Sequence, residues 1–184
     1  MRRFGLIGRP LGHSASAAYF TEKFNREGIT DCEYSLYELG SIGDLPGLLE
    51  RLPELCGLNV TIPYKRDVMA YCDVLDPMAE AIGSVNTLVR RADGKLYGYN
   101  TDAAGFCFMA QRAGIGFAGK KTLVLGSGGA SLTAQCVLGE LGAEVVVVSR
   151  SGADNYENVY SHTDAALIVN ATPVGMYPRN GERL

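Results

Sequence analysis

The sequence has few of the residues that metal centres, disulfide frameworks and nucleic-acid interfaces require. It contains no tryptophan, two histidines and five cysteines in 184 residues, and no cysteines are paired as Cys-x-x-Cys. The small number of histidines and the wide spacing of the cysteines predict no metal site. They favour reduced cysteines that pack as small apolar side chains. The 17 basic residues are spread along a chain of net charge −3, and phosphate binding instead favours clustered basic residues. Nucleic-acid binding is therefore not expected.

Long apolar runs are also absent. No stretch approaches the roughly 18 apolar residues of a membrane-spanning helix, so no membrane association is expected. An arginine pair near the start is followed by no apolar segment, so no signal peptide is recognised and a cytoplasmic location is expected. An apolar share of 47% and a charged share of 20% are typical of a globular protein with one domain or two small ones.

Short apolar runs alternate with helix-like segments, which is typical of βαβ units and a mostly parallel sheet. Pro63 is expected to end the third strand and to open a helix carrying Lys65, Val68, Met69 and Cys72. Two later runs flank an Asp-Gly pair, which predicts a β-hairpin. The first half of the chain is therefore expected to be a mixed-sheet α/β domain, with strands at 4–8, 32–39, 57–61, 85–90 and 96–99 and helices at about 14–28 and 44–52.

The composition changes after residue 101. A helix is expected at 102–113, and three continuous runs of Val, Ile and Leu follow at 122–125, 144–148 and 165–169. Such runs favour parallel strands buried on both faces. The prediction is an α/β protein with a mixed-sheet domain at 1–101, followed by a second domain with a parallel sheet at 102–184.

A glycine-rich turn lies between the first of these strands and the next predicted helix. Gly126 allows a tight turn, Gly128 lets the backbone approach a pyrophosphate, and the helix N-terminus offers free N–H groups. Ser131 replaces the third glycine of the usual pattern and is small enough for close packing. A purely structural turn is the alternative, but a strand before and a helix after favour dinucleotide binding by residues 126–131, which are Gly126, Ser127, Gly128, Gly129, Ala130 and Ser131.

The end of the second strand indicates which dinucleotide is bound. An NAD site usually has an acidic residue there, whereas this chain has Ser149, Arg150 and Ser151. A guanidinium and two hydroxyls suit the 2′-phosphate of NADP, because arginine presents a planar pair of donors to phosphate oxygens. NADP is therefore favoured, with a solvated surface arginine as the structural alternative.

Polar residues gather where the strands of the first half are expected to end. Ligands of open α/β sheets bind at the carboxyl ends of strands, and all of these groups except Asn86 are near such an end. Each also has a plain structural explanation: Ser14 and Ser16 as helix caps, Lys65 as a surface charge, Asn86 as a hairpin partner and Asp102 as an N-cap. Taken together they favour a site for a small polyhydroxylated acid, formed by Ser14, Ser16, Thr61, Lys65, Asn86 and Asp102.

At this point the sequence resembles the shikimate dehydrogenases. Six segments carry the resemblance in order along nearly the whole chain: GRPLGHSAS (8–16), NVTIPYK (59–65), GSVNT (83–87), GYNTD (98–102), GSGGAS (126–131) and NATPVGM (170–176). The resemblance implies a substrate domain, a Rossmann-like NADP domain and an active site in the cleft between them. It also implies the reversible reduction of 3-dehydroshikimate to shikimate by NADPH.

The resemblance also implies residue roles. Lys65 and Asp102 are the catalytic pair, and residues 126–131 and 149–151 hold the cofactor. The substrate's carboxylate and hydroxyls are held by Ser14, Ser16, Thr61, Lys65, Asn86 and Asp102.

The chain departs from the family pattern in three places. Ala17 replaces a usual proline, which affects only the first helical turn. Asp154 follows where a basic residue is common, and an acidic side chain near a 2′-phosphate keeps NAD open as an alternative. Family members also continue well beyond the last motif, so an incomplete chain with an exposed half-sheet is expected. Other readings are a quinate/shikimate dehydrogenase using NAD or NADP, or a catalytically silent binding module, and a homodimer is allowed.

Overall fold

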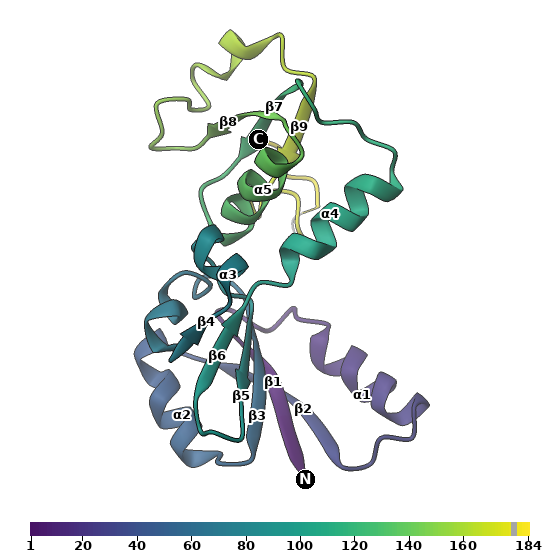
Figure 1. The fold of residues 1–184 in the computed structure, drawn as a ribbon, viewed down its shortest axis with the longest axis vertical. Helices are drawn as coiled ribbons and strands as arrows, with labels where there is room; N and C mark the ends of the chain where they lie inside the picture. The colour runs from purple at the N-terminus through teal and green to yellow at the C-terminus, as the bar shows by residue number, and fades with distance from the viewer. Residues whose placement is uncertain (178–179) are drawn as a thin grey trace. The chain divides into compact units, whose positions relative to one another are not determined.

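The computed structural model describes residues 1–177 and 180–184, and the chain divides into two compact units (Figure 1). One unit comprises Met1–Asn100 and the other Thr101–Leu184. Each unit has its own sheet, and both sheets belong to the predicted α/β class.

The first unit is built on a six-stranded mixed sheet with the order β2-β1-β3-β5-β6-β4. β1, β2 and β3 run parallel, β5 and β6 form the predicted antiparallel hairpin, and β4 pairs parallel with β6. The predicted strands are therefore confirmed, and β4 is an addition. Their bounds are Arg2–Gly8 (β1), Cys32–Glu38 (β2), Leu55–Val60 (β3), Val74–Leu75 (β4), Thr87–Arg90 (β5) and Leu96–Tyr99 (β6).

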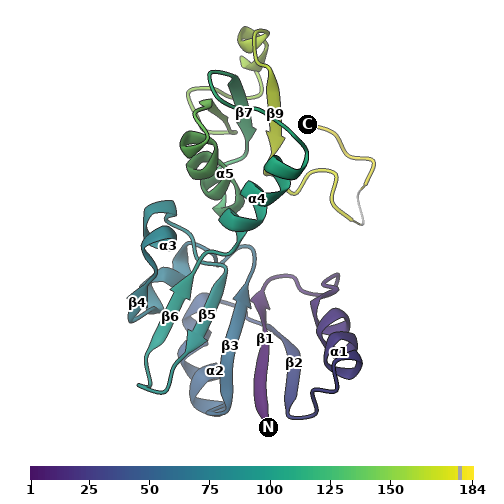
Figure 2. The same cartoon turned by 45° about the vertical axis from the view of Figure 1, so that its right-hand side comes forward.

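Helices cover both faces of this sheet. Figures 1 and 2 show α1 (Ser16–Arg26) on the opposite side from α2 (Leu45–Arg51). The apolar face of α1, with Ala17, Phe20 and Phe24, packs on Leu6 and Tyr34 as its spacing predicts. The larger core lies on the other face, where α2, α3 (Pro77–Ile82) and two 3₁₀ turns, η1 (Ile42–Asp44) and η2 (Asp67–Tyr71), pack against Ile7, Leu58 and Leu88.

The helix predicted after Pro63 is wrong. Residues 62–66 form a turn, η2 follows as a 3₁₀ segment, and Cys72 lies beyond it. An α-helix would use the Lys65 carbonyl for the Met69 amide, but that carbonyl accepts from Val85 N at 2.8 Å. The Met69 amide donates instead to the Arg66 carbonyl at 3.1 Å, which is the shorter 3₁₀ spacing. A contact distant in sequence therefore decides the conformation of this segment.

The second unit contains a parallel sheet in the order β8-β7-β9, with α4 and α5 packed side by side on one face. The predicted strands and helices are confirmed, and they form a Rossmann-like arrangement of parallel strands and helices. Their bounds are Asp102–Arg112 (α4), Lys121–Leu125 (β7), Gly129–Glu140 (α5), Glu144–Val148 (β8), Val159–His162 (η3) and Leu167–Asn170 (β9).

The expectation that all three strands are buried on both faces is wrong for β8 and β9. In β8 Val148 alone is buried, and in β9 Leu167 and Val169 face the helices whereas Ile168 between them is 66% exposed. Among the described strands of this unit, the central strand β7 alone has a continuous buried stretch, at Thr122, Leu123 and Val124. The apolar run of β9 therefore leaves an exposed face in the described part of the unit.

Candidate functional site

The sheet topology of the first unit brings the predicted polar residues to one edge. β1, β3 and β6 run in the same direction, so their carboxyl ends meet there. Asn86 was the exception in the sequence, because it precedes a strand instead of following one. Since β5 runs antiparallel to β3, its amino end lies at the same edge, and the Val60 amide donates to the Asn86 carbonyl at 2.7 Å. Asn86 thus joins the set at 8% exposure.

The loop that carries Ser14 and Ser16 is held by contacts from the last residue of β2 and from the segment that follows it. The Leu11 amide donates to Glu38 Oε2 at 2.7 Å, and Arg9 Nη1 donates to the Gly40 carbonyl at 2.8 Å. The N-cap residue of α1 is Ala15, so the prediction of a serine at that position is wrong. Ser14 still acts at the helix start, because its Oγ accepts from the Ser16 amide at 3.2 Å.

Thr61 and Lys65 lie on the turn that follows β3. The Thr61 amide donates to the Ile7 carbonyl at 2.9 Å, which continues the β1–β3 pairing to the edge. Tyr64, which is buried, fixes the turn from below by donating through its hydroxyl to the Leu39 carbonyl at 2.7 Å. Lys65 follows with its carbonyl bound to Val85 and its side chain half-buried. The backbone of Lys65 is therefore fixed by a contact outside the turn.

Sequence reasoning missed a hydrogen-bonded pair beneath this edge. The Tyr34 hydroxyl on β2 donates to Asn59 Oδ1 on β3 at 2.8 Å. Burial raises the pKa of Tyr34 to about 12. Nothing local in the sequence marks Tyr34, since it occupies an ordinary core position of a strand.

Asp102 lies at the start of the second unit, one residue after Thr101. β6 ends at Tyr99, and the buried Asn100 donates through Nδ2 to the Ser84 carbonyl at 2.9 Å, so the chain leaves the first unit at the edge that carries Asn86. Thr101 is the N-cap of α4 and Asp102 lies in the first turn, so the prediction that Asp102 is the N-cap is wrong by one residue. An acidic side chain in a first turn stabilises a helix, which gives Asp102 a structural contribution as well.

The glycine turn of the second unit connects β7 to α5. Gly126 adopts φ +110°, and a Cβ there would lie 3.1 Å from the Ala171 carbonyl oxygen, so glycine is required. Ser131 is fully buried and its hydroxyl donates to the Gly126 carbonyl at 2.7 Å, which supports the turn from inside. Ser127, Gly128 and Ala130 are exposed, and the space beside Gly128 is open. An exposed helix start can accept a phosphate group through its free N–H groups. Cofactor binding by residues 126–131 stays a prediction.

Residues 149–151 form a turn directly after β8. Ser149 is 8% exposed and its carbonyl accepts from the Gly152 amide at 3.3 Å, while Arg150 and Ser151 are exposed. Asp154, which raised the question of NADP preference, has its Oδ1 2.7 Å from His162 Nε2. The carboxylate is therefore engaged by a side chain of its own unit.

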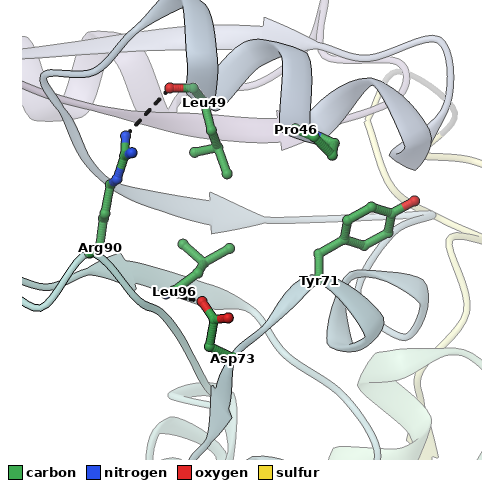
Figure 3. Close-up of a pocket in the computed structure, with 7 residues that line it drawn as sticks. Pro46, Leu49, Tyr71, Asp73, Arg90 and Leu96 are labelled. Carbon is green, nitrogen blue, oxygen red and sulfur yellow. Dashed lines mark hydrogen bonds between the residues drawn. The ribbon is translucent and has the colours of Figure 1, made fainter.

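A cavity of about 220 Å³ lies elsewhere in the first unit (Figure 3). Arg90 donates to the Leu49 carbonyl at 3.4 Å and Asp73 accepts from the Leu96 amide at 2.8 Å, so the main chain engages both charges. None of the predicted site residues is among those that line it, which are Pro46, Leu49, Tyr71, Asp73, Arg90, Gly94 and Leu96.

Residues 1–177 and 180–184 contain no group of three or more His, Cys, Asp or Glu side chains that could hold a metal ion. In the same residues no helix has the length and apolar character needed to cross a membrane.

Comparison with known proteins identifies relatives along the whole chain. A family profile described as "Shikimate dehydrogenase substrate binding domain" matches residues 6–88. A shikimate dehydrogenase (NADP(+)) of Symbiobacterium thermophilum is 36% identical over 96% of this chain and 68% of its own length.

Solved structures agree with this similarity. Shikimate dehydrogenase 1 of Peptoclostridium difficile matches with a TM-score of 0.86 and 39% identity, over 97% of this chain and 69% of that one. A shikimate 5-dehydrogenase of Thermus thermophilus, in complex with NADP(H) and shikimate, matches with a TM-score of 0.78 and 34% identity, over 95% of this chain and 70% of that one.

Proposed function

Because the chain belongs to the shikimate dehydrogenase family, we propose that it catalyses the reversible, NADP-dependent interconversion of shikimate and 3-dehydroshikimate. The observation that carries this proposal is the polar set at one edge of the first sheet: Ser14, Ser16, Thr61, Lys65 and Asn86. Hydroxyls, an amide and an ammonium group match a substrate with one carboxylate and several hydroxyls.

In this proposal some side chains bind the substrate and Lys65 transfers the proton. Oxidation of a secondary alcohol removes a hydride from carbon and a proton from oxygen, so a group must take that proton. Lys65 takes it in the direction of oxidation and returns it to the carbonyl oxygen in reduction. Asp102 orients the reacting hydroxyl and Lys65, while Ser14, Ser16, Thr61 and Asn86 hold the remaining oxygens.

The residues of the second unit fit NADP. The start of α5 presents backbone N–H groups beside Gly128, where a Cβ would meet no atom within 4 Å, so a pyrophosphate can approach the backbone there. When bound, NADP supplies the group that accepts or donates the hydride. Gly126, Ser127, Gly128, Gly129, Ala130 and Ser131 form or support the pyrophosphate turn, and Ser149, Arg150 and Ser151 lie where the strand following α5 ends.

Arg150→Ala is expected to weaken NADP+ binding by about 10- to 100-fold, because one charge-assisted bond to the 2′-phosphate is lost. NAD+ has no such phosphate, so its affinity is expected to stay constant. Calorimetric titration with each dinucleotide measures both values, with Arg112→Ala at the end of α4 as a control. Equal losses for NADP+ and NAD+ would show that Arg150 does not read the 2′-phosphate.

The function is tested by NADP+-linked oxidation of shikimate by the native protein, followed through the absorbance of the reduced nicotinamide. We expect turnover with shikimate and NADP+, and little with quinate. Turnover of quinate at a comparable rate would identify a quinate/shikimate dehydrogenase, and binding without turnover would identify a silent module. A cytoplasmic location and a homodimer stay predictions.

A further inference from the structure

One acidic residue of the second unit contacts both the end of β8 and η3. The Asp154 carbonyl accepts from the Ser149 amide at 3.0 Å, and Asp154 forms a parallel bridge with Val148. Its carboxylate Oδ1 lies 2.7 Å from Nε2 of His162, the last residue of η3. Asp154 therefore connects η3 to the residue at which the segment 149–151 begins.

The imidazole of His162 is the donor in this contact. An ionised carboxylate accepts hydrogen bonds and donates none, so the shared proton belongs to Nε2. The His162 side chain is 14% exposed, and within the described residues its Nδ1 is buried without a hydrogen-bond partner. In the described part of the chain, the hydrogen bonding of this ring is thus confined to Asp154.

Arg150 is close in sequence to this carboxylate but is not paired with it. Residues 149–154 form a closed turn, in which the Gly152 amide also donates to the Ser149 carbonyl at 3.3 Å. Arg150 is exposed, and among residues 1–177 and 180–184 it forms no ion pair. A carboxylate and a phosphate compete for the same donors of a guanidinium, and they repel each other. The position of the Asp154 side chain therefore matters for any phosphate bound at Arg150.

We propose that His162 is a positioning residue for cofactor selection: its hydrogen bond holds the Asp154 carboxylate at η3 and leaves the Arg150 guanidinium to the 2′-phosphate of NADP. This inference rests on the proposed function, in which Arg150 binds that phosphate. NAD has no 2′-phosphate, so release of the carboxylate affects NADP alone. An acidic residue near this turn is thus compatible with NADP binding, because His162 engages it.

His162→Phe tests the proposal, because it keeps a ring of similar size and removes the Nε2 donor. The dissociation constant for NADP+ is expected to rise about tenfold, since the released Asp154 carboxylate competes for Arg150. The dissociation constant for NAD+ is expected to stay constant. His162→Gln keeps an amide donor for Asp154 and is expected to retain the native NADP+ affinity. Titration calorimetry measures both dinucleotides, with Tyr160→Phe, at 82% exposure on the same η3, as the matched control.

Asp154→Asn separates an effect of charge from a loosening of the turn. Asparagine keeps an oxygen that accepts from His162 but has no negative charge with which to compete for Arg150. Adding His162→Phe to Asp154→Asn is therefore expected to leave NADP+ affinity unchanged. A loss that persists in this double variant, or that extends to NAD+, overturns the inference, because His162 would then only stabilise the turn.

The native protein and Arg150→Ala distinguish failure of the inference from failure of the proposed function. If the native protein binds neither dinucleotide, or if Arg150→Ala weakens NADP+ and NAD+ equally, the proposed role of Arg150 fails and the inference fails with it. If NADP+ is preferred through Arg150 but His162→Phe keeps that preference, only the inference is overturned.

Discussion

Lys65→Met is expected to lower kcat for NADP+-linked shikimate oxidation by about a thousandfold, within the range for loss of a general acid–base group. Methionine keeps most of the length and volume of the side chain but has no proton to exchange. The backbone of Lys65 is held by the Val85 amide, so the turn is expected to keep its conformation. Affinity for shikimate should therefore change little, and steady-state rates combined with calorimetric binding separate the two effects.

The control for this prediction is Lys95→Met, which removes an exposed ammonium group from the β5–β6 hairpin of the same unit. It is expected to leave both kcat and shikimate affinity unchanged. An unchanged kcat in Lys65→Met would remove Lys65 from the mechanism. A large loss of affinity with kcat preserved would instead assign Lys65 to substrate binding alone.

The elements that sequence predicts correctly are those in which local pattern and packing agree. The hairpin follows from Asp93 and Gly94 between two apolar runs, and β5 and β6 pair antiparallel from Arg90 with Leu96 to Thr87 with Tyr99. The β7–α5 turn follows from Gly126, whose φ of +110° few other residues adopt. In both places a short segment contains the whole physical cause.

The errors arise where a distant residue supplies the cause. The sequence predicts Lys65 to be helical, but its carbonyl accepts a hydrogen bond from the Val85 amide, twenty positions away, and is not available to a helix. In the sequence, Asn86 is the one predicted site residue that does not follow a strand. The antiparallel pairing of β5 with β3 explains why it still lies with the others. The role of Tyr34 cannot be predicted for the same reason. Its partner Asn59 is close only because the sheet places β2 and β3 on either side of β1. Strand order is the information that a single sequence does not carry locally.

Gly8→Ala is expected to damage stability and the substrate site together. Gly8 ends β1, and a Cβ there would lie 2.3 Å from Thr61 Cγ2 and 2.9 Å from the Ile62 carbonyl oxygen. The Arg9 amide donates to that same carbonyl at 3.0 Å, so the turn after β3 cannot move away without losing a bond. The free energy of unfolding should fall by roughly 1–3 kcal/mol, as for other overpacked sites. Because Thr61 and Lys65 are carried by the displaced turn, the dissociation constant for shikimate should rise about tenfold or more.

Gly57→Ala separates the two consequences of Gly8→Ala. Its Cβ would press on the Leu88 carbonyl oxygen at 3.0 Å and on the Phe4 ring at 3.5 Å, in the middle of the sheet instead of at its edge. We expect this variant to lower the free energy of unfolding while shikimate affinity stays constant, as denaturant titration and calorimetry would measure. An equal loss of affinity in both variants would mean that general destabilisation weakens binding. A loss confined to Gly8→Ala would show that β1 ends in glycine because the turn bearing Thr61 and Lys65 packs directly against its backbone.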